Sequence, residues 1–161
     1  VIDPTTYGTS TVGTATTYRT TYAMKFSGSP GTFTPDETIT QTNSDSLVAT
    51  GKVIEYDATL QILYYQHEKF SGYGTLSSTG GLNLFSGTGT VTGGTSSATG
   101  TPDSSADSAV SLAGGNTITF TNGFANPELQ PDSGNIIYRE NRKPISRATD
   151  QTEDIKIIVE F

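Results

Sequence analysis

Apolar and polar residues alternate along several short stretches of the chain, and this period of two is typical of β-strands with one buried face. The clearest stretch in the first half is 17–26, where Tyr18, Tyr22 and Phe26 fall on one side. Residues 27–31, which are rich in Gly, Ser and Pro, follow it directly. We therefore predict a strand over 17–26 that ends in a turn.

A meander of strands is predicted over residues 32–66, with a short strand at 38–40 and longer strands at 47–56 and 60–65 joined by a hairpin turn. The strand at 60–65 carries apolar residues on both faces. One face holds Leu60, Ile62 and Tyr64, and the other holds Leu63 and Tyr65. We expect this strand to be covered on both sides.

A short pattern recurs three times, as a Phe followed five residues later by Thr, an aliphatic residue, and Thr or Ser. It begins at Phe33, Phe70 and Phe85. The spacings between these Phe residues are unequal, which excludes a solenoid or a propeller. We interpret the pattern as a turn that leads into a strand, with the Phe anchoring the turn to the core.

Two segments lack a sustained period. Residues 1–16 are predicted to form an extended N-terminal arm, and 17–161 a single β domain. Within that domain, residues 86–116 contain few large apolar side chains, so we predict a long loop or a segment ordered by a partner. A short strand is expected at 117–120.

The last part of the chain, residues 133–161, is predicted to form a charged hairpin. Its strands are expected at 136–138 and at 155–161, where every second residue is apolar. The connection between them carries Arg139, Arg142, Lys143 and Arg147 against Glu140. Such a connection is either a solvated charged turn or a docking surface whose arginines pair with carboxylates of a partner.

Composition places the chain in the all-β class. The sequence of 161 residues contains 29 Thr, 17 Ser and 18 Gly, and only 16% of its residues are charged. Thr favours pleated surfaces and Gly favours turns, so we predict an antiparallel β-sandwich or a small barrel-like module with long Gly/Ser/Thr-rich loops. Cysteine is absent, so neither a disulfide nor a thiolate metal site can form.

The net charge of −7 lies entirely in residues 1–138, which hold 4 basic and 11 acidic residues, whereas 139–161 hold 5 of each. Phosphate binding requires an aligned basic stripe, so nucleic acid is not expected as a partner. Membrane insertion is not expected either, because no run approaches the ~20 apolar residues of a span.

Residues that could carry catalysis are sparse. The single histidine, His67, follows a predicted strand and is interpreted as an exposed loop residue. The sequence contains no phosphate-binding loop, calcium loop or zinc-protease motif. We therefore predict no enzymatic activity, no cofactor and no metal.

The C-terminal strings IIYRENRKPISR, at 136–147, and DQTEDIKIIVEF, at 150–161, are similar to the end of a baseplate wedge protein of T4-like contractile-tailed bacteriophages. The best match within the baseplate is the wedge subunit that dimerises. The resemblance implies a virion structural protein of the tail baseplate, assembled in the host cytoplasm. Its implied partners are other baseplate wedge or tail proteins, or a second copy in a homodimer.

A subunit contact is predicted at the charged part of this region. Its candidate residues are Arg139, Arg142, Lys143, Arg147, Asp150, Glu153 and Asp154. The terminal strand beside them would leave a ladder edge that another subunit can cover. The alternative is that these charges pair within one chain and fix the loop.

A carbohydrate- or receptor-binding β-sandwich of a tail fibre or surface protein is the rival interpretation. The eight Tyr and the polar surface favour it, whereas the absence of Trp, a common sugar platform, argues against it.

Overall fold

The structure, a computed structural model, describes residues 2–17, 19–43, 46–68, 83–105, 109–113 and 115–138. Every regular element in these ranges is a β-strand. The predicted all-β class is therefore confirmed, and of the two architectures offered the barrel is the one observed.

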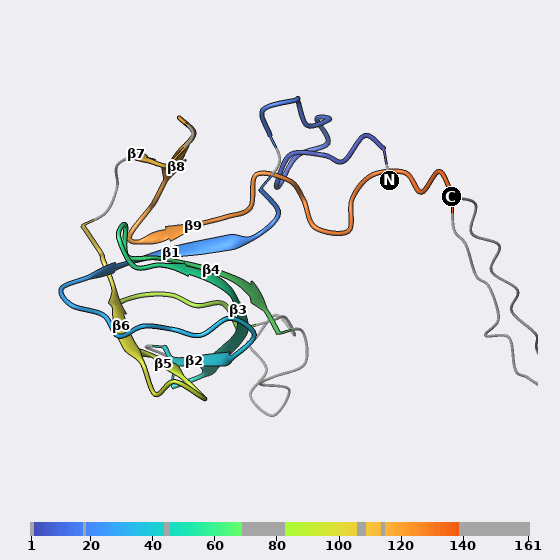
Figure 1. Cartoon of the computed structure of the whole chain (residues 1–161). Coiled ribbons are helices and arrows are strands. Elements are labelled where there is room, and N and C mark those ends of the chain that lie inside the picture. The colour runs from blue at the N-terminus through green and yellow to red at the C-terminus, as the bar shows by residue number, and fades with distance from the viewer. Residues whose placement is uncertain are drawn as a thin grey trace, which may run out of the picture.

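Six antiparallel strands close into the barrel (Figure 1). They are β1 (Tyr22–Ser27), β2 (Thr38–Thr42), β3 (Val48–Asp57), β4 (Ile62–His67), β5 (Val91–Gly93) and β6 (Thr99–Pro102). The order around the barrel is β4-β3-β2-β5-β6-β1, and pairing of β1 with β4 closes the ring. A short strand, β9 (Phe124–Ala125), pairs with β1 on the same edge as β6. The meander predicted over 32–66 is present as β2, β3 and β4, with the hairpin turn at 58–61.

Large apolar side chains from opposite walls fill the barrel. The interior cluster includes Met24, Phe26, Ile39, Val53, Leu63, Tyr65 and Val91. Phe33 and Phe85, which begin two of the recurring patterns, are 3% and 5% exposed in the same cluster. The anchoring role predicted for these two Phe residues is thus confirmed, whereas Phe70 lies outside the described residues.

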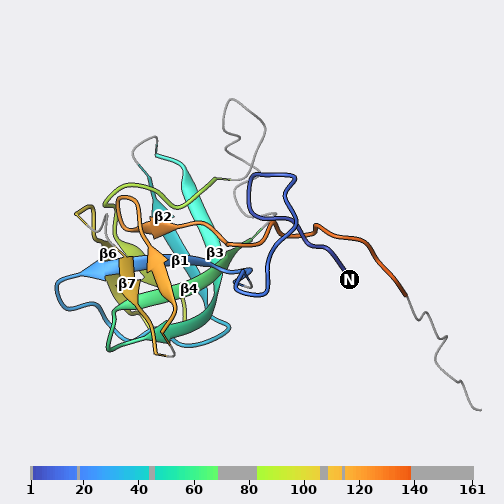
Figure 2. The ribbon, with the colours of Figure 1, turned by 90° about the horizontal axis from the view of Figure 1, so that it is seen from above.

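A second cluster lies on the outside of the barrel. There the hairpin of β7 (Ala109–Ser111) and β8 (Thr117–Thr119) lies across β1 and β4 (Figure 2). The cluster consists of Ala23, Ile62, Ile118, Phe120 and Ala125, with Leu60 and Tyr64 packed against it. Strand β4 is therefore covered on both faces, as its sequence predicts, because Leu63 and Tyr65 point into the barrel.

The segment 86–116 is not the long loop predicted from the sequence, because it contains β5, β6 and β7. Strands β5 and β6 complete the barrel wall with Gly93 and Gly100 at inward positions, so Val91 is the one aliphatic side chain that β5 contributes to the interior. At Gly100 a Cβ would lie 2.8 Å from the ring of Phe26, so that ring already occupies the interior space. The apolar alternation expected of a strand is consequently missing from the sequence.

The turn between β5 and β6 is held by a buried carboxylate. Glu37, 4% exposed, accepts hydrogen bonds from the backbone N–H groups of Thr34, Thr95 and Ser96 at 2.7–3.0 Å. The hydroxyl of Ser96 donates to the same carboxylate. Because a buried charge is tolerated only when it is well hydrogen-bonded, this arrangement fixes the turn against the start of β2.

Candidate interaction surface

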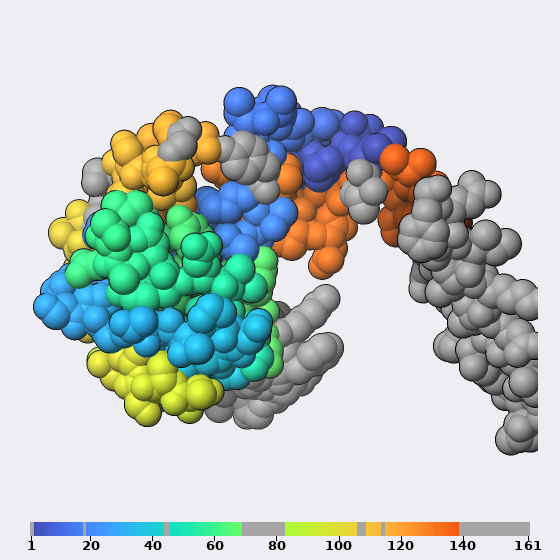
Figure 3. All heavy atoms as spheres, in the orientation of Figure 1, coloured from blue at the N-terminus to red at the C-terminus, as the bar shows by residue number. Residues whose placement is uncertain are grey.

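Two segments distant in sequence run side by side and project from the barrel (Figures 1 and 3). Residues 2–13 and 126–138 form this projection, which we call the stem. At its outer part Ile2 and Asn135 exchange two backbone hydrogen bonds, of 2.9 and 2.8 Å. Further bonds between the segments join Thr5 to Gln130 and Ser133, Tyr7 to Glu128, and Gly8 to Gln130.

The middle of the stem is built around Leu129, which is 9% exposed. Residues 5–12 fold back on themselves, with a bridge between Thr5 and Val12. Gly13 follows, and a Cβ there would lie only 2.6 Å from Leu129 Cδ2. The Leu129 side chain therefore packs directly against the Gly13 backbone, so the N-terminal segment wraps this one apolar residue.

Arg19 attaches the stem to the barrel. Its backbone carbonyl accepts hydrogen bonds from the N–H groups of Glu128 and Leu129, and its guanidinium donates to the carbonyls of Thr21 and Asn126. Burial lowers the pKa of Arg19 from its usual value, although Glu128 acts in the opposite sense. These bonds take the backbone of residue 19 away from β1, which is why that strand begins at Tyr22 and not at the predicted residue 17.

Aromatic contacts provide a second attachment. Tyr7 of the stem packs edge-on against Tyr22 of β1, with ring centroids 6.1 Å apart and hydroxyl oxygens 3.4 Å apart. Tyr22 in turn contacts Tyr65 and His67. Burial raises the pKa of Tyr22, and the Tyr7 hydroxyl adds to this effect. The stem is thus joined to the aromatic residues at one end of the barrel.

The prediction of an exposed loop position for His67 is wrong. His67 is the last residue of β4, and its ring stacks on Phe85 at 5.4 Å and lies edge-on to Tyr22 and Tyr65. Burial lowers its pKa to about 4, so the imidazole is neutral at pH 7. Within the described part of the chain its buried Nδ1 has no hydrogen-bond partner, and the ring therefore acts as an aromatic packing residue.

The outer end of the stem is apolar and exposed. Ile136, Ile137 and Tyr138 are 72%, 67% and 75% exposed. The strand predicted at 136–138 is not present, because the ladder with the N-terminal segment ends at Asn135. Three consecutive large apolar side chains in water are unfavourable unless another surface covers them.

The residues predicted to form the subunit contact, and the strand predicted at 155–161, lie outside the described residues. They are Arg139, Arg142, Lys143, Arg147, Asp150, Glu153 and Asp154. The chain reaches them directly from Tyr138, so they follow the exposed end of the stem in the sequence. The division into an arm and one β domain stays a prediction.

Within the described ranges no group of three or more His, Asp or Glu side chains could hold a metal ion. No described helix is long and apolar enough to cross a membrane.

Residues 109–161, about a third of the chain, match the family model described as Bacteriophage T4, Gp8, a baseplate wedge protein. The matched region contains β7, β8, β9 and one half of the stem, and it continues through the predicted contact residues. This finding confirms the resemblance of the C-terminal region to a baseplate wedge protein of T4-like phages. No curated protein and no solved structure matches the chain.

Proposed function

We propose, from the similarity of its C-terminal third to the bacteriophage T4 Gp8 family, that the chain is a structural protein of a phage tail baseplate. Its role in the virion is to join neighbouring baseplate proteins through protein contacts, without catalysis. The observation that carries this proposal is the exposed apolar end of the stem at Ile136, Ile137 and Tyr138, which lies inside the matched region.

The chemistry of the stem suits a protein partner. The buried centres of interfaces are enriched in apolar and aromatic side chains, and Ile136, Ile137 and Tyr138 supply both. Because the stem projects from the barrel, a neighbour can approach its end without displacing the barrel (Figure 1). Contact there would remove from water the most exposed of the large apolar side chains in the described part of the chain.

Charges after the stem support the same proposal. Arg139, Arg142, Lys143 and Arg147 follow the apolar end, and arginine pairs bidentately with carboxylates. Together with Asp150, Glu153 and Asp154 they would form a charged rim around an apolar centre. Pairing of these charges within one chain is the competing arrangement.

The direct test replaces the apolar end of the stem. We expect Ile136→Ser with Ile137→Ser to leave the barrel folded but to abolish incorporation into tails in cells infected by a phage that lacks its own copy. The matched control is Val48→Ser with Ile54→Ser, at apolar positions of β3 that are 39% and 47% exposed. Equal incorporation of both variants would refute the role of the stem.

The charged residues need a separate variant. Arg142→Glu with Arg147→Glu should block assembly if these arginines contact a neighbour, since the reversed charges would repel its carboxylates. Normal assembly of that variant would remove these residues from the proposed contact. Sedimentation of the isolated chain, with and without the Ile136 and Ile137 substitutions, tests whether the neighbour is a second copy.

A further inference from the structure

A surface of the barrel away from the stem is covered by threonine hydroxyls. Strands β2, β5 and β6 lie side by side, and the register places Thr40 opposite Thr92 and Thr92 opposite Thr99. All three side chains are exposed. Directly opposed residues of antiparallel strands point to the same face, so these hydroxyls form a row across three strands.

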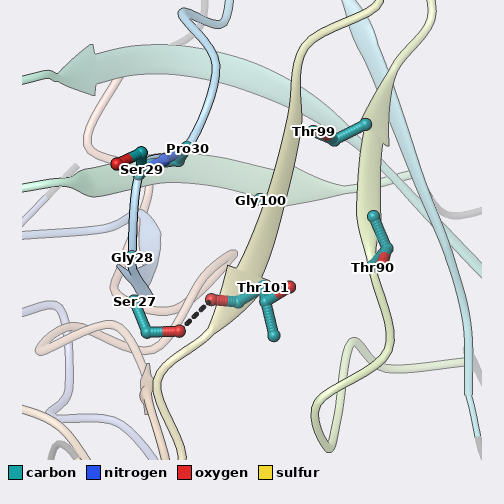
Figure 4. A pocket seen from close by; sticks show the side chains of 8 residues that line it. All are labelled: Ser27, Gly28, Ser29, Pro30, Thr90, Thr99, Gly100 and Thr101. Atoms are coloured by element: carbon teal, nitrogen blue, oxygen red, sulfur yellow. Dashed lines mark hydrogen bonds between the residues drawn. The ribbon is translucent and has the colours of Figure 1, made fainter.

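An open groove of about 400 Å³ lies at the end of this row (Figure 4). The turn that follows β1 forms one side, and β6 with the residue before β5 forms the other. The lining residues are Ser27, Gly28, Ser29, Pro30, Thr90, Thr99, Gly100 and Thr101. Its walls are fixed, because the N–H of Gly31 donates to the Thr99 carbonyl at 2.8 Å and the Ser27 hydroxyl donates to the Thr101 carbonyl.

The threonine hydroxyls of the groove are available to a ligand. No described residue forms a hydrogen bond with the side-chain hydroxyl of Thr90, Thr99 or Thr101. Threonines near the N-terminus behave differently, since hydroxyls there pair with one another. These pairs are Thr6 with Thr9, Thr14 with Thr16, and Thr14 with Thr17. The hydroxyls of Thr90, Thr99 and Thr101 therefore each keep one donor and two acceptor positions.

Charge limits the ligand class. No groove residue is ionisable, although the whole chain has a net charge of −7. An anionic or cationic ligand would find no counter-charge there, and the net negative charge would further disfavour an anion. A neutral molecule that carries many hydroxyls can both donate to and accept from Thr hydroxyls, while the Thr methyl groups and the Pro30 ring contact its C–H faces.

We propose that this groove binds a neutral oligosaccharide. Its volume lies within the range of about 300–1,000 Å³ of small-molecule sites. The exposed row of Thr40, Thr92 and Thr99 extends the hydroxyl surface beyond the groove, which suits a chain of sugar units rather than a single one. This activity is independent of the stem and of assembly into the baseplate.

The experiment titrates the ¹⁵N-labelled chain with maltohexaose, mannohexaose and a galactan oligomer, with a galacturonate oligomer as the anionic counterpart. Concentrations reach about 10 mM, because a few neutral hydrogen bonds support only weak affinity. We expect at least one neutral oligomer to shift the amides of Gly28, Gly100 and Thr101, and the galacturonate oligomer not to do so.

The discriminating variant is Thr99→Val with Thr101→Val, which keeps the shape and the methyl groups but removes two hydroxyls. It should weaken binding about tenfold, as expected for the loss of two neutral hydrogen bonds. The matched control, Thr117→Val with Thr119→Val, changes two exposed threonines of β8 and should bind as the wild type does.

Three results would overturn the proposal. They are no shift with any neutral oligomer, equal shifts with the galacturonate oligomer, and unchanged binding by the Thr99 and Thr101 variant. Urea unfolding of each variant verifies that the barrel is intact. Tail incorporation of the same variants should stay normal, so failure here is distinguishable from failure of the stem proposal.

Discussion

The hydroxyl of Ser96 lies 2.7 Å from Oε1 of Glu37 and donates a hydrogen bond to that buried carboxylate. Ser96 belongs to the turn between β5 and β6, and Glu37 precedes β2, so the contact joins parts of the chain 59 residues apart. It also explains Gly93, where a Cβ would lie within 2.8 Å of both carboxylate oxygens. The carboxylate therefore holds two strands that have little apolar surface of their own.

Glu37→Gln should destabilise the barrel by about 2–4 kcal/mol, because Gln keeps only one acceptor oxygen. Its amide nitrogen must then face either the N–H of Thr34 or the N–H groups of Thr95 and Ser96, from which it cannot accept a hydrogen bond. Urea unfolding at pH 7 measures the difference. The matched control is Glu55→Gln, an exposed position on β3 that should change stability little. A similar loss in both variants would show that general charge removal, and not this network, is responsible.

The same network predicts a pH dependence. Burial raises the pKa of Glu37, but the hydrogen bonds from Ser96, Thr34 and Thr95 outweigh burial and leave the pKa below its usual value. Stability from a carboxylate with a lowered pKa is fully present above its unfolded value, about 4.3, and is lost as the pH falls through the folded value. The difference between wild type and Glu37→Gln should therefore be constant from pH 5 to 7, at the order of magnitude given above, and shrink below about pH 4.

We expect His67 to make the stability of the fold sensitive to acid in a different pH range. Burial lowers the pKa of His67 to about 4, whereas in the unfolded chain it is about 6.5. Between these values the unfolded state binds the proton more readily, so folding weakens as the pH falls, by at most about 3 kcal/mol. His67→Phe keeps the ring beside Phe85 and should remove the loss between pH 6.5 and 4.5. Unfolding curves at several pH values measure this loss in the wild type and in His67→Phe. An equal loss in both proteins, or an NMR titration showing a His67 pKa near 6.5, would contradict the prediction.

Gly100 tests the close approach of β6 to the barrel interior. A Cβ there would lie 2.8 Å from Cδ1 and Cε1 of Phe26, so Gly100→Ala should cost about 1–3 kcal/mol. Phe26→Ala removes Cγ, Cδ1 and Cε1, the ring atoms in conflict. In the double variant the total cost should be clearly smaller than the sum of the single costs, as measured by urea unfolding. Additive costs would mean that the conflict is relieved elsewhere.

The alternation of apolar and polar residues predicted the strands whose own apolar side chains fill the barrel. Strands β2, β3 and β4 follow from it, and so does coverage of both faces of β4. Strands β5 and β6 do not, because Gly93 and Gly100 lie inward. The space at Gly100 is filled by the Phe26 ring of another strand, and the space at Gly93 by the Glu37 carboxylate. The sequence of a strand does not show that the space in front of its glycine is filled by a residue distant in sequence.

The pairing of the two halves of the stem could not be predicted from the sequence, for a related reason. Its two halves are joined mainly by backbone hydrogen bonds and by the polar side chains of Gln130 and Ser133, which leave no apolar period. The apolar run at 136–138 was visible in the sequence, but its exposure was not. For His67, position alone suggested a loop, because the rings of Tyr22 and Phe85 that bury it come from other parts of the chain.

Leu129 should control the stem separately from the barrel. Leu129→Ala removes the apolar centre of the stem, and such truncations cost about 2–5 kcal/mol at fully buried sites. The backbone hydrogen bonds around it come from the N–H groups of Tyr7, Gly13 and Gln130.

Hydrogen exchange of these three amides should therefore accelerate by at least about tenfold in Leu129→Ala, while the amides of β3 and β4 keep their rates. Val12→Ala, at a stem position that is 48% exposed, is the control and should leave all of them unchanged. A uniform acceleration across the barrel would mean that stem and barrel open together. Because the stem has its own apolar centre, we expect it to open as a separate unit, which would let a neighbouring protein adjust it without unfolding the barrel.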